Sequence, residues 1–342
     1  MCGIRTHRLP DNDYFNESAV HARYAAAATL RRVTVTATTD HTTLALTREY
    51  YRDDERTLEW DALAERLSVP ASHVAADLTG RSAPGIVAGR YHVSRLLGTG
   101  GMGAVWLAHD EVLHRPVALK QFSDERRDGG SCPLREARAA ARISHPGVVQ
   151  VHDVILDEDG DWLVMEALPG EPLSTIIRER GRLPVDEVRQ IALQLLPALQ
   201  AIHAVDLVHR DIKPSNIQVC GGDRIVLTDF GLSSPPSAGG GSRGSVAGSL
   251  RYMAPETIID GQFGPASDLY SLGVTLYTAI EGQLPFDPGT PMSLLESARS
   301  AALAAPRHAG YLGEVLSGLL ESNPGRRMDA ARALSHLQLI GP

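Results

Sequence analysis

The sequence predicts an α+β fold for residues 89–341, preceded by an N-terminal extension over residues 1–88. The first observation is that strand-like and helix-like stretches alternate from Gly89 onward, at the density of one compact unit. The second is a break in composition, because a Ser-Ala-Pro-Gly turn at 82–85 separates the two parts. No internal repeat is found after Gly89.

Composition and charge limit which classes of protein the chain can belong to. The chain has 342 residues, of which 43% are hydrophobic and 22% charged, and this suits about two units with a sizeable core. The formal net charge of −8 argues against sequence-independent nucleic-acid binding, which needs a basic surface. Nucleic acid is therefore not expected as a partner.

Cysteine usage and hydropathy bear on the compartment. Cys2, Cys132 and Cys220 are odd in number and form no close pair, so neither a disulfide framework nor a zinc site is expected. No run approaches the roughly 18–20 apolar residues of a membrane span. The N-terminus also lacks a basic region followed by an apolar stretch. We therefore expect a cytoplasmic protein without a membrane span.

Two short helices are expected in the extension, over residues 57–67 and 71–78, with a turn at 68–70 between them. The outline resembles a helix-turn-helix, but residues 71–78 contain no Lys or Arg to hold phosphates. A helical pair that packs on another surface, or is partly disordered, is the favoured interpretation. The role of the extension stays open.

A glycine-rich stretch follows the first predicted strand of the main part, Tyr91 to Leu97. Residues 98–105, Gly-Thr-Gly-Gly-Met-Gly-Ala-Val, match the pattern G-x-G-x-x-G-x-V and lead into a second predicted strand, Val105 to His109. Glycines let backbone N–H groups approach phosphates without a side-chain clash. Alone the pattern is weak, and a simple turn is the alternative. The strand that follows favours a flap over phosphates rather than a dinucleotide-binding loop, which a helix would follow.

The next predicted strand, Val117 to Lys120, ends in a lysine just beyond the glycine-rich stretch, where a cation could meet nucleotide phosphates. Residues 133–143 then have a helical pattern that contains Glu136. Two interpretations stay open. Either Glu136 forms an ion pair that holds the Lys120 ammonium in place, or both are solvated and Glu136 pairs locally with neighbouring arginines.

Two further motifs follow a long amphipathic helix, which is predicted over Leu183 to Ala204 with a kink at Pro197. The first motif is Val-His-Arg-Asp-Ile-Lys-Pro-Ser-Asn at 208–216, and the second is Asp-Phe-Gly at 229–231. With the glycine-rich stretch and its lysine, they occur in the order and spacing of a known family. The chain resembles the eukaryotic-like serine/threonine protein kinases, in their bacterial form, over about residues 89–341.

The resemblance implies a two-lobed protein kinase fold with ATP and a divalent cation between the lobes. The β-rich small lobe would extend over about residues 89–166 and the mostly helical large lobe over about 167–341. The implied activity is transfer of the γ-phosphoryl group of ATP to Ser or Thr hydroxyls of proteins. Asn216 and Asp229 would hold Mg²⁺, or alternatively Mn²⁺.

The resemblance also implies a role for each remaining site residue. Asp211 would accept or orient the proton of the substrate hydroxyl, and Lys213 would neutralise the transferring phosphate. Lys120, braced by Glu136, would contact the α- and β-phosphates. The residues implied in nucleotide binding are Leu97, Gly98, Gly100, Gly103, Val105, Ala118, Lys120, Met165, Glu166, Leu168 and Gln218.

Several architectural features follow from the same resemblance. Residues 165–168 would form the hinge, whose backbone bonds to adenine. An Ala-Pro-Glu motif ends at Glu256, which would pair with Arg327, and Asp268 would brace the backbone of the catalytic loop. His209 has the side chain of a general base, but this position is structural in the family.

Two positions depart from the family pattern. Gln218 stands where a bulky apolar side chain usually forms the floor of the adenine site. Its methylene groups can still pack, while its amide is expected to affect ATP or inhibitor binding. Asp206 stands where Gly is usual before the catalytic loop, and Asp tolerates a positive φ better than most residues. Neither change removes a catalytic group.

The activation segment, residues 229–256, contains serines but no threonine. We expect autophosphorylation there, with Ser242 and Ser245 as the best candidates and Arg210 available to bind the phosphate. The alternative is that these serines are only part of a linker. Ser249 is instead expected to contact the catalytic aspartate or lysine.

Two other function classes stay open. A pseudokinase scaffold would be expected to lack Lys120, Asp211 or Asp229, and all three are present. A small-molecule phosphotransferase of related fold is disfavoured by the Ala-Pro-Glu motif and the Ser-rich loop at 233–245, which would serve protein substrates and switching. The expected partners are ATP, proteins with Ser or Thr, and a second copy of the chain for autophosphorylation.

Overall fold

The computed structural model describes residues 85–100, 103–122, 133–157, 160–229, 249–286, 296–297 and 303–340, and the backbone at 31–39 and 42–50. The chain divides into two compact units, Met1–Ser68 and Val69–Pro342.

The first unit contains a β-hairpin that the sequence was not taken to predict. Its strands, β1 (Arg31–Thr39) and β2 (Thr42–Tyr50), pair in antiparallel register. The alternation of Val and Thr at 33–36 is the period-2 pattern of a strand and could have indicated it. The helices expected over 57–67 and 71–78 lie outside the described residues.

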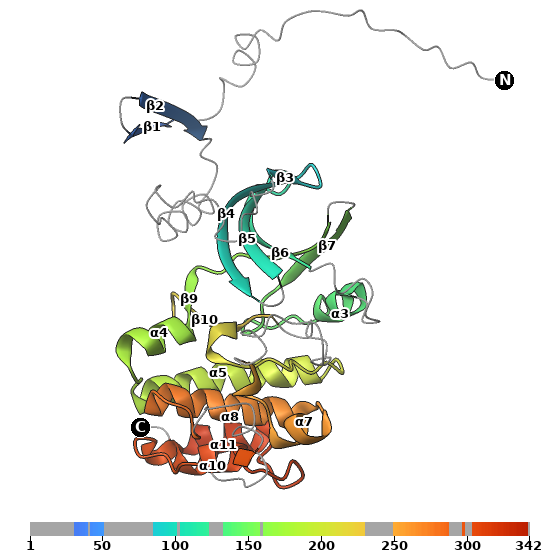
Figure 1. Ribbon diagram of the computed structural model, residues 1–342, viewed down its shortest axis with the longest axis vertical. Helices are drawn as coiled ribbons and strands as arrows, with labels where there is room; N and C mark the ends of the chain where they lie inside the picture. Colours follow the sequence, from blue (N-terminus) through green and yellow to red (C-terminus); the bar gives the residue numbers. More distant parts are fainter. Residues whose placement is uncertain are drawn as a thin grey trace, which may run out of the picture. The chain divides into compact units, whose positions relative to one another are not determined.

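A curled six-stranded antiparallel sheet forms one side of the second unit (Figure 1), in the order β3-β4-β5-β6-β8-β7. Its strands are β3 (Ile86–Val87), β4 (Tyr91–Gly100), β5 (Gly103–Asp110), β6 (Arg115–Gln121), β7 (Val151–Asp157) and β8 (Gly160–Glu166). Each strand predicted here is present and is longer than predicted. The helix α3 (Pro133–Ala140) packs beside β7 and ends three residues before its predicted end.

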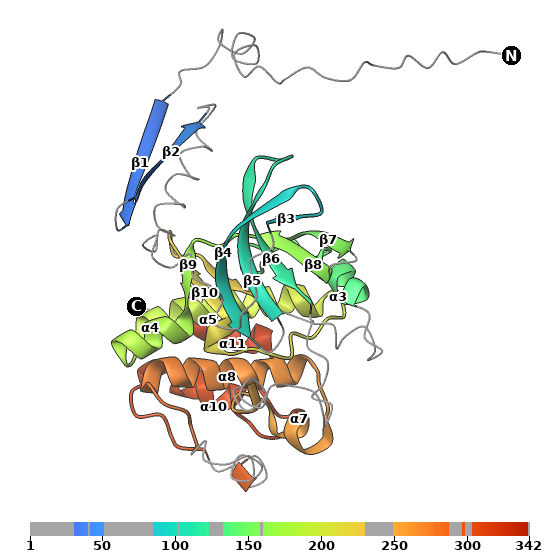
Figure 2. The ribbon, with the colours of Figure 1, turned by 45° about the horizontal axis from the view of Figure 1, so that its top comes forward.

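Helices form the other side of this unit, as Figure 2 shows after rotation. They are α4 (Leu173–Arg180), α5 (Val185–His203), the 3₁₀ turn η3 (Pro214–Asn216), α7 (Pro255–Asp260), α8 (Pro265–Glu281), the 3₁₀ turn η4 (Gly310–Leu312), α10 (Gly313–Leu319) and α11 (Ala330–Leu339). A small antiparallel sheet of order β11-β10-β9 accompanies them. Its strands are β9 (Gly170–Pro172), β10 (Ile217–Cys220) and β11 (Ile225–Leu227). The predicted two-lobed α+β architecture is confirmed.

The helix α5 matches its predicted apolar stripe. It begins after Pro184, whose φ of −57° suits the entry to a helix, and Pro197 lies inside it. The side chains at the predicted spacing are no more than 3% exposed; they are Val188, Ile191, Leu195, Leu199 and Ile202.

Two apolar cores lie on opposite faces of the six-stranded sheet. Val117 and Leu119 of β6 belong to the smaller core, with the sheet's two buried tryptophans. Ala118, between them, belongs to the larger core, which extends into the helices. Because side chains alternate along a strand, Lys120 shares the face of Ala118. The lysine therefore lies on the side of the sheet where the large core begins.

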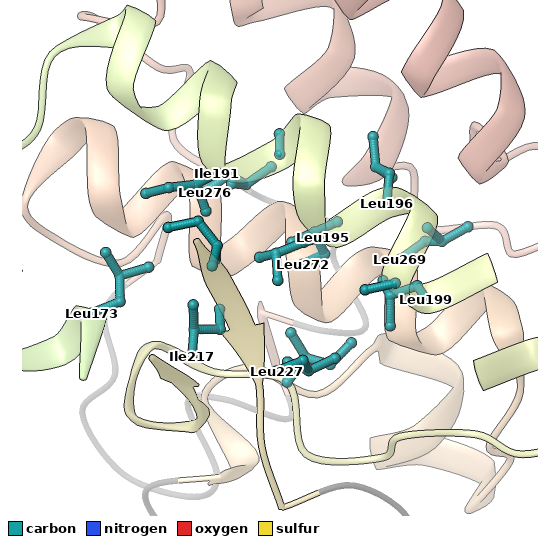
Figure 3. Close-up of a cluster of buried hydrophobic side chains, with 14 of the residues drawn as sticks. Leu173, Ile191, Leu195, Leu196, Leu199, Ile217, Leu227, Leu269, Leu272 and Leu276 are labelled. Atoms are coloured by element: carbon teal, nitrogen blue, oxygen red, sulfur yellow. The ribbon is translucent and has the colours of Figure 1, made fainter. Parts of the chain in front are cut away.

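The larger core fills the space where α4, α5 and α8 meet β10 and β11 (Figure 3). Its labelled side chains are no more than 5% exposed; they are Leu173, Ile191, Leu195, Leu196, Leu199, Ile217, Leu227, Leu269, Leu272 and Leu276. Full burial of such a side chain contributes about 1.5–3 kcal/mol. The strand β10 directly follows the 208–216 motif, and β11 ends shortly before Asp229. Packing of these two strands against the helices therefore holds both motifs in position.

Among the described residues, no helix has the length and apolar character needed to cross a membrane.

Candidate functional site

A buried lysine of the sheet meets an aspartate that follows β11. Lys120 is 2% exposed, and its Nζ lies 2.7 Å from Oδ1 of Asp229. Burial alone would raise the pKa of the Asp229 carboxyl. The charge of Lys120 and its hydrogen bond outweigh burial, so this pKa lies below its ordinary value. Asp229 is therefore ionised near neutral pH, beside a fixed cation.

Asp211 is held by two side chains of its own loop. Lys213 Nζ donates to Oδ2 of Asp211 at 2.8 Å, and Asn216 Nδ2 donates to the same oxygen at 2.9 Å. Asn216 Nδ2 also donates to the Asp211 carbonyl oxygen at 2.8 Å. Lys213 Nζ makes a further bond of 2.8 Å to Oγ of Ser249, a contact that was predicted for this serine. The carboxylate thus sits beside a second cation with its orientation fixed.

Hydrogen bonds join this loop to the segment that carries Asp229. The backbone N–H of Thr228 donates to the carbonyl oxygen of Asn216 at 2.9 Å, and its hydroxyl donates to the same oxygen at 3.2 Å. Nε2 of His209 lies 3.0 Å from the carbonyl oxygen of Thr228. The Lys120–Asp229 pair and the cluster around Asp211 therefore belong to one bonded network.

Asp268 of α8 braces the backbone of the loop, as predicted. It is 1% exposed, and its carboxylate accepts the backbone N–H groups of His209 at 2.8 Å and Arg210 at 2.9 Å. Nε2 of His203 lies 2.8 Å from the same carboxylate. These are charge-assisted bonds, which are stronger than neutral ones.

His209 is a packing residue rather than a general base. Its side chain is fully buried, and burial lowers its pKa, so the ring is neutral at pH 7. Since a carbonyl oxygen only accepts, Nε2 carries the proton and donates to Thr228. Nδ1 accepts the backbone N–H of Asp211 at 3.3 Å. Both ring nitrogens are thus engaged, in agreement with the structural role implied for this position.

Three non-glycine residues around the loop have positive φ: Asp206 at 60°, Arg210 at 69° and Asp229 at 59°. Each such conformation costs about 1–3 kcal/mol and persists where the surrounding structure imposes it. For Asp206, this agrees with the expectation that Asp replaces Gly at a positive-φ position. The Arg210 guanidinium lies 5.6 Å from the centre of the Phe263 ring.

The glycine-rich stretch includes the end of β4 and the start of β5. Gly100 is paired with Gly103, and Val105 lies opposite Lys120 in the β5–β6 register. Gly103 has φ of 125°, and a Cβ there would lie 2.1 Å from the Gln121 carbonyl oxygen. Only glycine fits this position without a backbone shift. Two other residues predicted to bind the nucleotide lie in β4; they are Leu97 and Gly98.

The predicted hinge begins at the end of β8. Met165 is opposite Ala118 of β6, and both are buried. Leu168 follows in the short segment between β8 and β9. The carboxylate of Glu166 is paired with Arg224, which donates to it through both terminal nitrogens. Gln218 of β10 has a buried Oε1 without a hydrogen-bond partner among the described residues.

Asn216 and Asp229 have the chemistry to hold a divalent cation. Both offer hard oxygen donors, and Asp229 is ionised because its pKa is lowered. Bonds from the Asn216 amide nitrogen to Asp211 fix the orientation of that amide. Within the described part of the chain, no group of three or more acidic, His or Cys side chains forms a closed metal cage. A site with two protein ligands suits Mg²⁺, which usually takes other ligands from phosphates and water.

Other predicted features lie partly or wholly outside the described residues. Glu136 belongs to α3, but its side chain is not described, so both interpretations of it stay open. The candidate phosphorylation sites Ser242 and Ser245 are also outside.

The predicted pair of Glu256 and Arg327 is present. Arg327 Nη1 and Nη2 donate to the two carboxylate oxygens of Glu256 at 2.6 and 2.9 Å. This ion pair connects the first turn of α7 to the segment before α11 and lies away from the chemistry.

Three residues were not predicted: His203, which bonds to the aspartate of α8 that braces the catalytic loop, Thr228, which bonds to that loop, and Arg224, which bonds to Glu166 at the end of β8. His203 lies in the last turn of a predicted helix, and Thr228 immediately precedes Asp-Phe-Gly, so position alone could have drawn attention to both. Arg224 lies in a Gly-Gly-Asp-Arg turn that carries no motif, and no local signal indicated its partner.

Comparisons with known proteins agree with this geometry. A family model described as the protein kinase domain matches residues 91–338. The serine/threonine-protein kinase PknA of Mycobacterium tuberculosis is 40% identical over 209 residues, which cover 58% of this chain and 48% of that protein. The serine/threonine-protein kinase PksC of Streptomyces coelicolor is 33% identical over 268 residues, covering 73% and 48%.

A solved structure, Rad53 residues 1–466 in complex with AMP-PNP, is similar with a TM-score of 0.63 and 27% sequence identity, covering 73% of this chain and 66% of that one. The chain spans about half the length of these two curated relatives.

Proposed function

This chain belongs to the protein kinase domain family, and we propose that it is a serine/threonine protein kinase that transfers the γ-phosphoryl group of ATP to Ser or Thr hydroxyls of proteins. The observation that carries the proposal is the bonding of Asp211 to both Lys213 and Asn216. Lys213, two positions after Asp211, matches the serine/threonine branch of the family. A carboxylate beside a cation suits a reaction that moves a proton and a phosphoryl group together.

In the proposed reaction, the substrate oxygen forms a bond to the γ-phosphorus while the bond to the β-phosphate oxygen breaks and ADP leaves. Asp211 accepts the hydroxyl proton, and Lys213 neutralises charge on the transferring oxygens. Lys120 holds the α- and β-phosphates. Mg²⁺, or Mn²⁺ in its place, would be held by Asn216 and Asp229 and would neutralise further phosphate charge when bound.

The nucleotide is proposed to bind under the flap and against the hinge. Gly98, Gly100 and Gly103 bring backbone N–H groups to the phosphates, and Lys120 exchanges its bond to Asp229 for the nucleotide. The base lies among apolar and backbone groups of both lobes; these are Leu97, Val105, Ala118, Met165, Glu166, Leu168 and Gln218. Glu136 braces Lys120 if its carboxylate reaches the ammonium.

The wider proposal concerns boundaries, compartment and self-modification. The kinase domain covers residues 89–341, with lobes at about 89–166 and 167–341. The short strand β3, at residues 86–87, pairs with β4 and so joins the sheet of this domain just before its proposed start. Three cysteines without a close pair suit a cytoplasmic location. Two copies meet during autophosphorylation on Ser242 or Ser245, and Arg210 binds the new phosphate.

Transfer of labelled phosphate from ATP to a generic protein substrate tests the main proposal. The wild-type chain is expected to label Ser and Thr in the presence of Mg²⁺, and Asp211→Asn and Lys120→Met are expected to lose nearly all transfer while they remain folded by circular dichroism. A pseudokinase would bind partners but transfer no phosphate. A small-molecule phosphotransferase would transfer phosphate but would not label the protein substrate. Either result would refute the proposal.

Mass spectrometry of the chain after incubation with ATP and Mg²⁺ tests autophosphorylation. Modification of Ser242 or Ser245 is expected in wild type and absent in Asp211→Asn. If no serine of the activation segment, residues 229–256, is modified, the autophosphorylation proposal fails.

A further inference from the structure

The two sheets of the second unit are connected by a very short piece of chain. β8 ends at Glu166 and β9 begins at Gly170, so only residues 167–169 lie between them. At the far end the chain is closely packed, because a Cβ on Gly170 would lie 2.5 Å from the Val219 carbonyl oxygen. At the near end, the backbone N–H of Glu166 donates to the Gln150 carbonyl oxygen at 2.9 Å.

Arg224 spans this connection from the turn between β10 and β11. Its Nη1 and Nη2 donate to Oε1 and Oε2 of Glu166 at 2.5 and 3.0 Å. Its Nε donates to the carbonyl oxygen of Pro146 at 2.9 Å. The guanidinium of Arg224 thus binds both the last residue of β8 and the segment before β7.

The turn that carries Arg224 is itself fixed to the large helix α5. Gln194 Nε2 donates to the carbonyl oxygen of Asp223 at 2.7 Å, and the N–H of Ile225 donates to Gln194 Oε1 at 3.0 Å. The backbone N–H of Cys220 donates to the carbonyl oxygen of Arg224 at 2.8 Å, which closes the turn. The guanidinium is therefore presented from a rigid base.

Polar contacts rather than close apolar packing hold the Arg224 side chain in place. A pocket of about 250 Å³ lies beside the pair and is lined by both partners together with His145, Pro146, Val148 and Gln150. The side chains of Arg224 and Glu166 are 34% and 26% exposed. Hydrogen bonding to Glu166 is also the main cause of the raised pKa of Arg224. Replacing the guanidinium therefore leaves no buried apolar void.

We propose that Arg224 and Glu166 form a hinge latch that holds the backbone of residues 166–168 in the orientation needed to bind the nucleotide base. Arg224 is then a positioning residue, and this role rests on the proposed kinase function. A free connection of three residues would have to be ordered when the base binds, at an entropic cost. A connection already clamped at both ends avoids part of that cost.

The simplest competing interpretation is an ordinary surface ion pair, many of which contribute nothing measurable. The chain contains a matched control for it. Arg180 and Glu187 form the same two-pronged contact, at 2.8 and 2.7 Å, between the end of α4 and the start of α5. That pair has the same chemistry but does not touch the hinge.

The experiment compares Arg224→Met, Glu166→Gln, their double variant and Arg180→Met in the full chain. Hydrogen exchange in the nucleotide-free protein is followed by mass spectrometry in a peptide that covers residues 163–170. Steady-state transfer then gives KM for ATP and kcat separately. Both hinge variants are expected to speed exchange in this peptide and to raise KM for ATP about three- to tenfold, with kcat changed less than about twofold.

The double variant adds a test of coupling. If Arg224 and Glu166 act through each other, its KM is expected to resemble that of the single variants rather than the product of their effects. Arg180→Met is expected to leave exchange at 163–170 and the KM unchanged.

Several results would overturn the latch. Exchange in residues 163–170 that is equal in wild type and Arg224→Met would do so, as would a rise in kcat at constant KM, which would indicate a brake instead. Failure of the proposed function would look different: the wild-type chain would transfer no phosphate, while the exchange measurement would still decide whether the latch orders the connection.

Discussion

Replacing Arg327 with alanine is expected to lower the free energy of unfolding by about 3–5 kcal/mol, which is the usual cost of breaking a buried ion pair from one side. The Arg327 side chain is 1% exposed, and that of its partner Glu256 is 11% exposed. Removal of the guanidinium would leave the Glu256 carboxylate buried without its cation.

The rest of the Arg327 environment adds to this loss. Besides the two bonds to Glu256, its nitrogens donate to the carbonyl oxygens of Ala266 at 2.7 Å, Glu321 at 2.8 Å and Ser322 at 3.2 Å. The guanidinium also lies 5.0 Å from the centre of the Tyr270 ring. Three carbonyl groups would therefore lose a partner, and the upper part of the range is expected.

Thermal unfolding by circular dichroism or calorimetry measures the effect. At about 2–4 °C per kcal/mol for a protein of this size, Arg327→Ala should lower Tm by about 6–20 °C. Arg327→Lys keeps the charge but cannot reproduce a planar fork of donors, so it should recover only a small part of the loss. It also supplies a measurable variant if the alanine form does not accumulate.

Arg180→Ala is the control, because its exposed pair with Glu187 should contribute at most about 1 kcal/mol. A Tm of Arg327→Ala within about 2 °C of wild type would refute the reasoning, since the buried pair would then behave like the exposed one.

Three further outcomes are expected. Gly103→Ala should raise KM for ATP about tenfold or more in the transfer assay, because Gly103 has φ of 125° and a Cβ would lie 2.1 Å from a backbone oxygen of β6. Gly98→Ala, whose Cβ would meet nothing within 4 Å, should have a clearly smaller effect, and equal effects would contradict the steric argument. Asp268→Ala should destabilise the protein by about 2–6 kcal/mol in urea unfolding, because a buried and a partly buried backbone N–H group lose their acceptor; an unchanged midpoint would contradict this. The pKa of Asp110 is lowered from 3.8 to about 2, mainly by its hydrogen bond from Arg90, so its ionised form contributes stability above pH 3.8 that is lost as the pH falls towards 2. Asp110→Asn should therefore flatten the stability–pH curve in this range, and a curve as steep as that of wild type would contradict the assignment.

Much of the site could be predicted because its residues lie in short motifs with defined chemistry. Asp211, Lys213 and Asn216 are close in sequence, and the structure brings them into direct contact. The fold was accessible for a similar reason, since α5 has an apolar stripe at helical spacing and Lys120 ends a short apolar run. Local pattern and tertiary packing agree at these places.

The remaining features depend on contacts that no local pattern contains. Arg224 and Glu166 are 58 residues apart, and neither the arginine nor its turn belongs to a motif. Lys120 and Asp229 are 109 residues apart and were expected to share a site, but not to bind each other directly. The hairpin at 31–50 was not predicted, although the alternation of Val and Thr at 33–36 is typical of a strand.

The short connection at 167–169 has a mechanical consequence. A second connection joins the lobes in the segment before β7, where the backbone N–H of Val149 donates to the carbonyl oxygen of Leu227 of β11 at 3.0 Å. The backbone N–H of Glu166, at the end of β8, donates to the carbonyl oxygen of Gln150 in this segment at 2.9 Å. Because this bond ties the two lobe connections to each other, we expect them to move together when the lobes open or close.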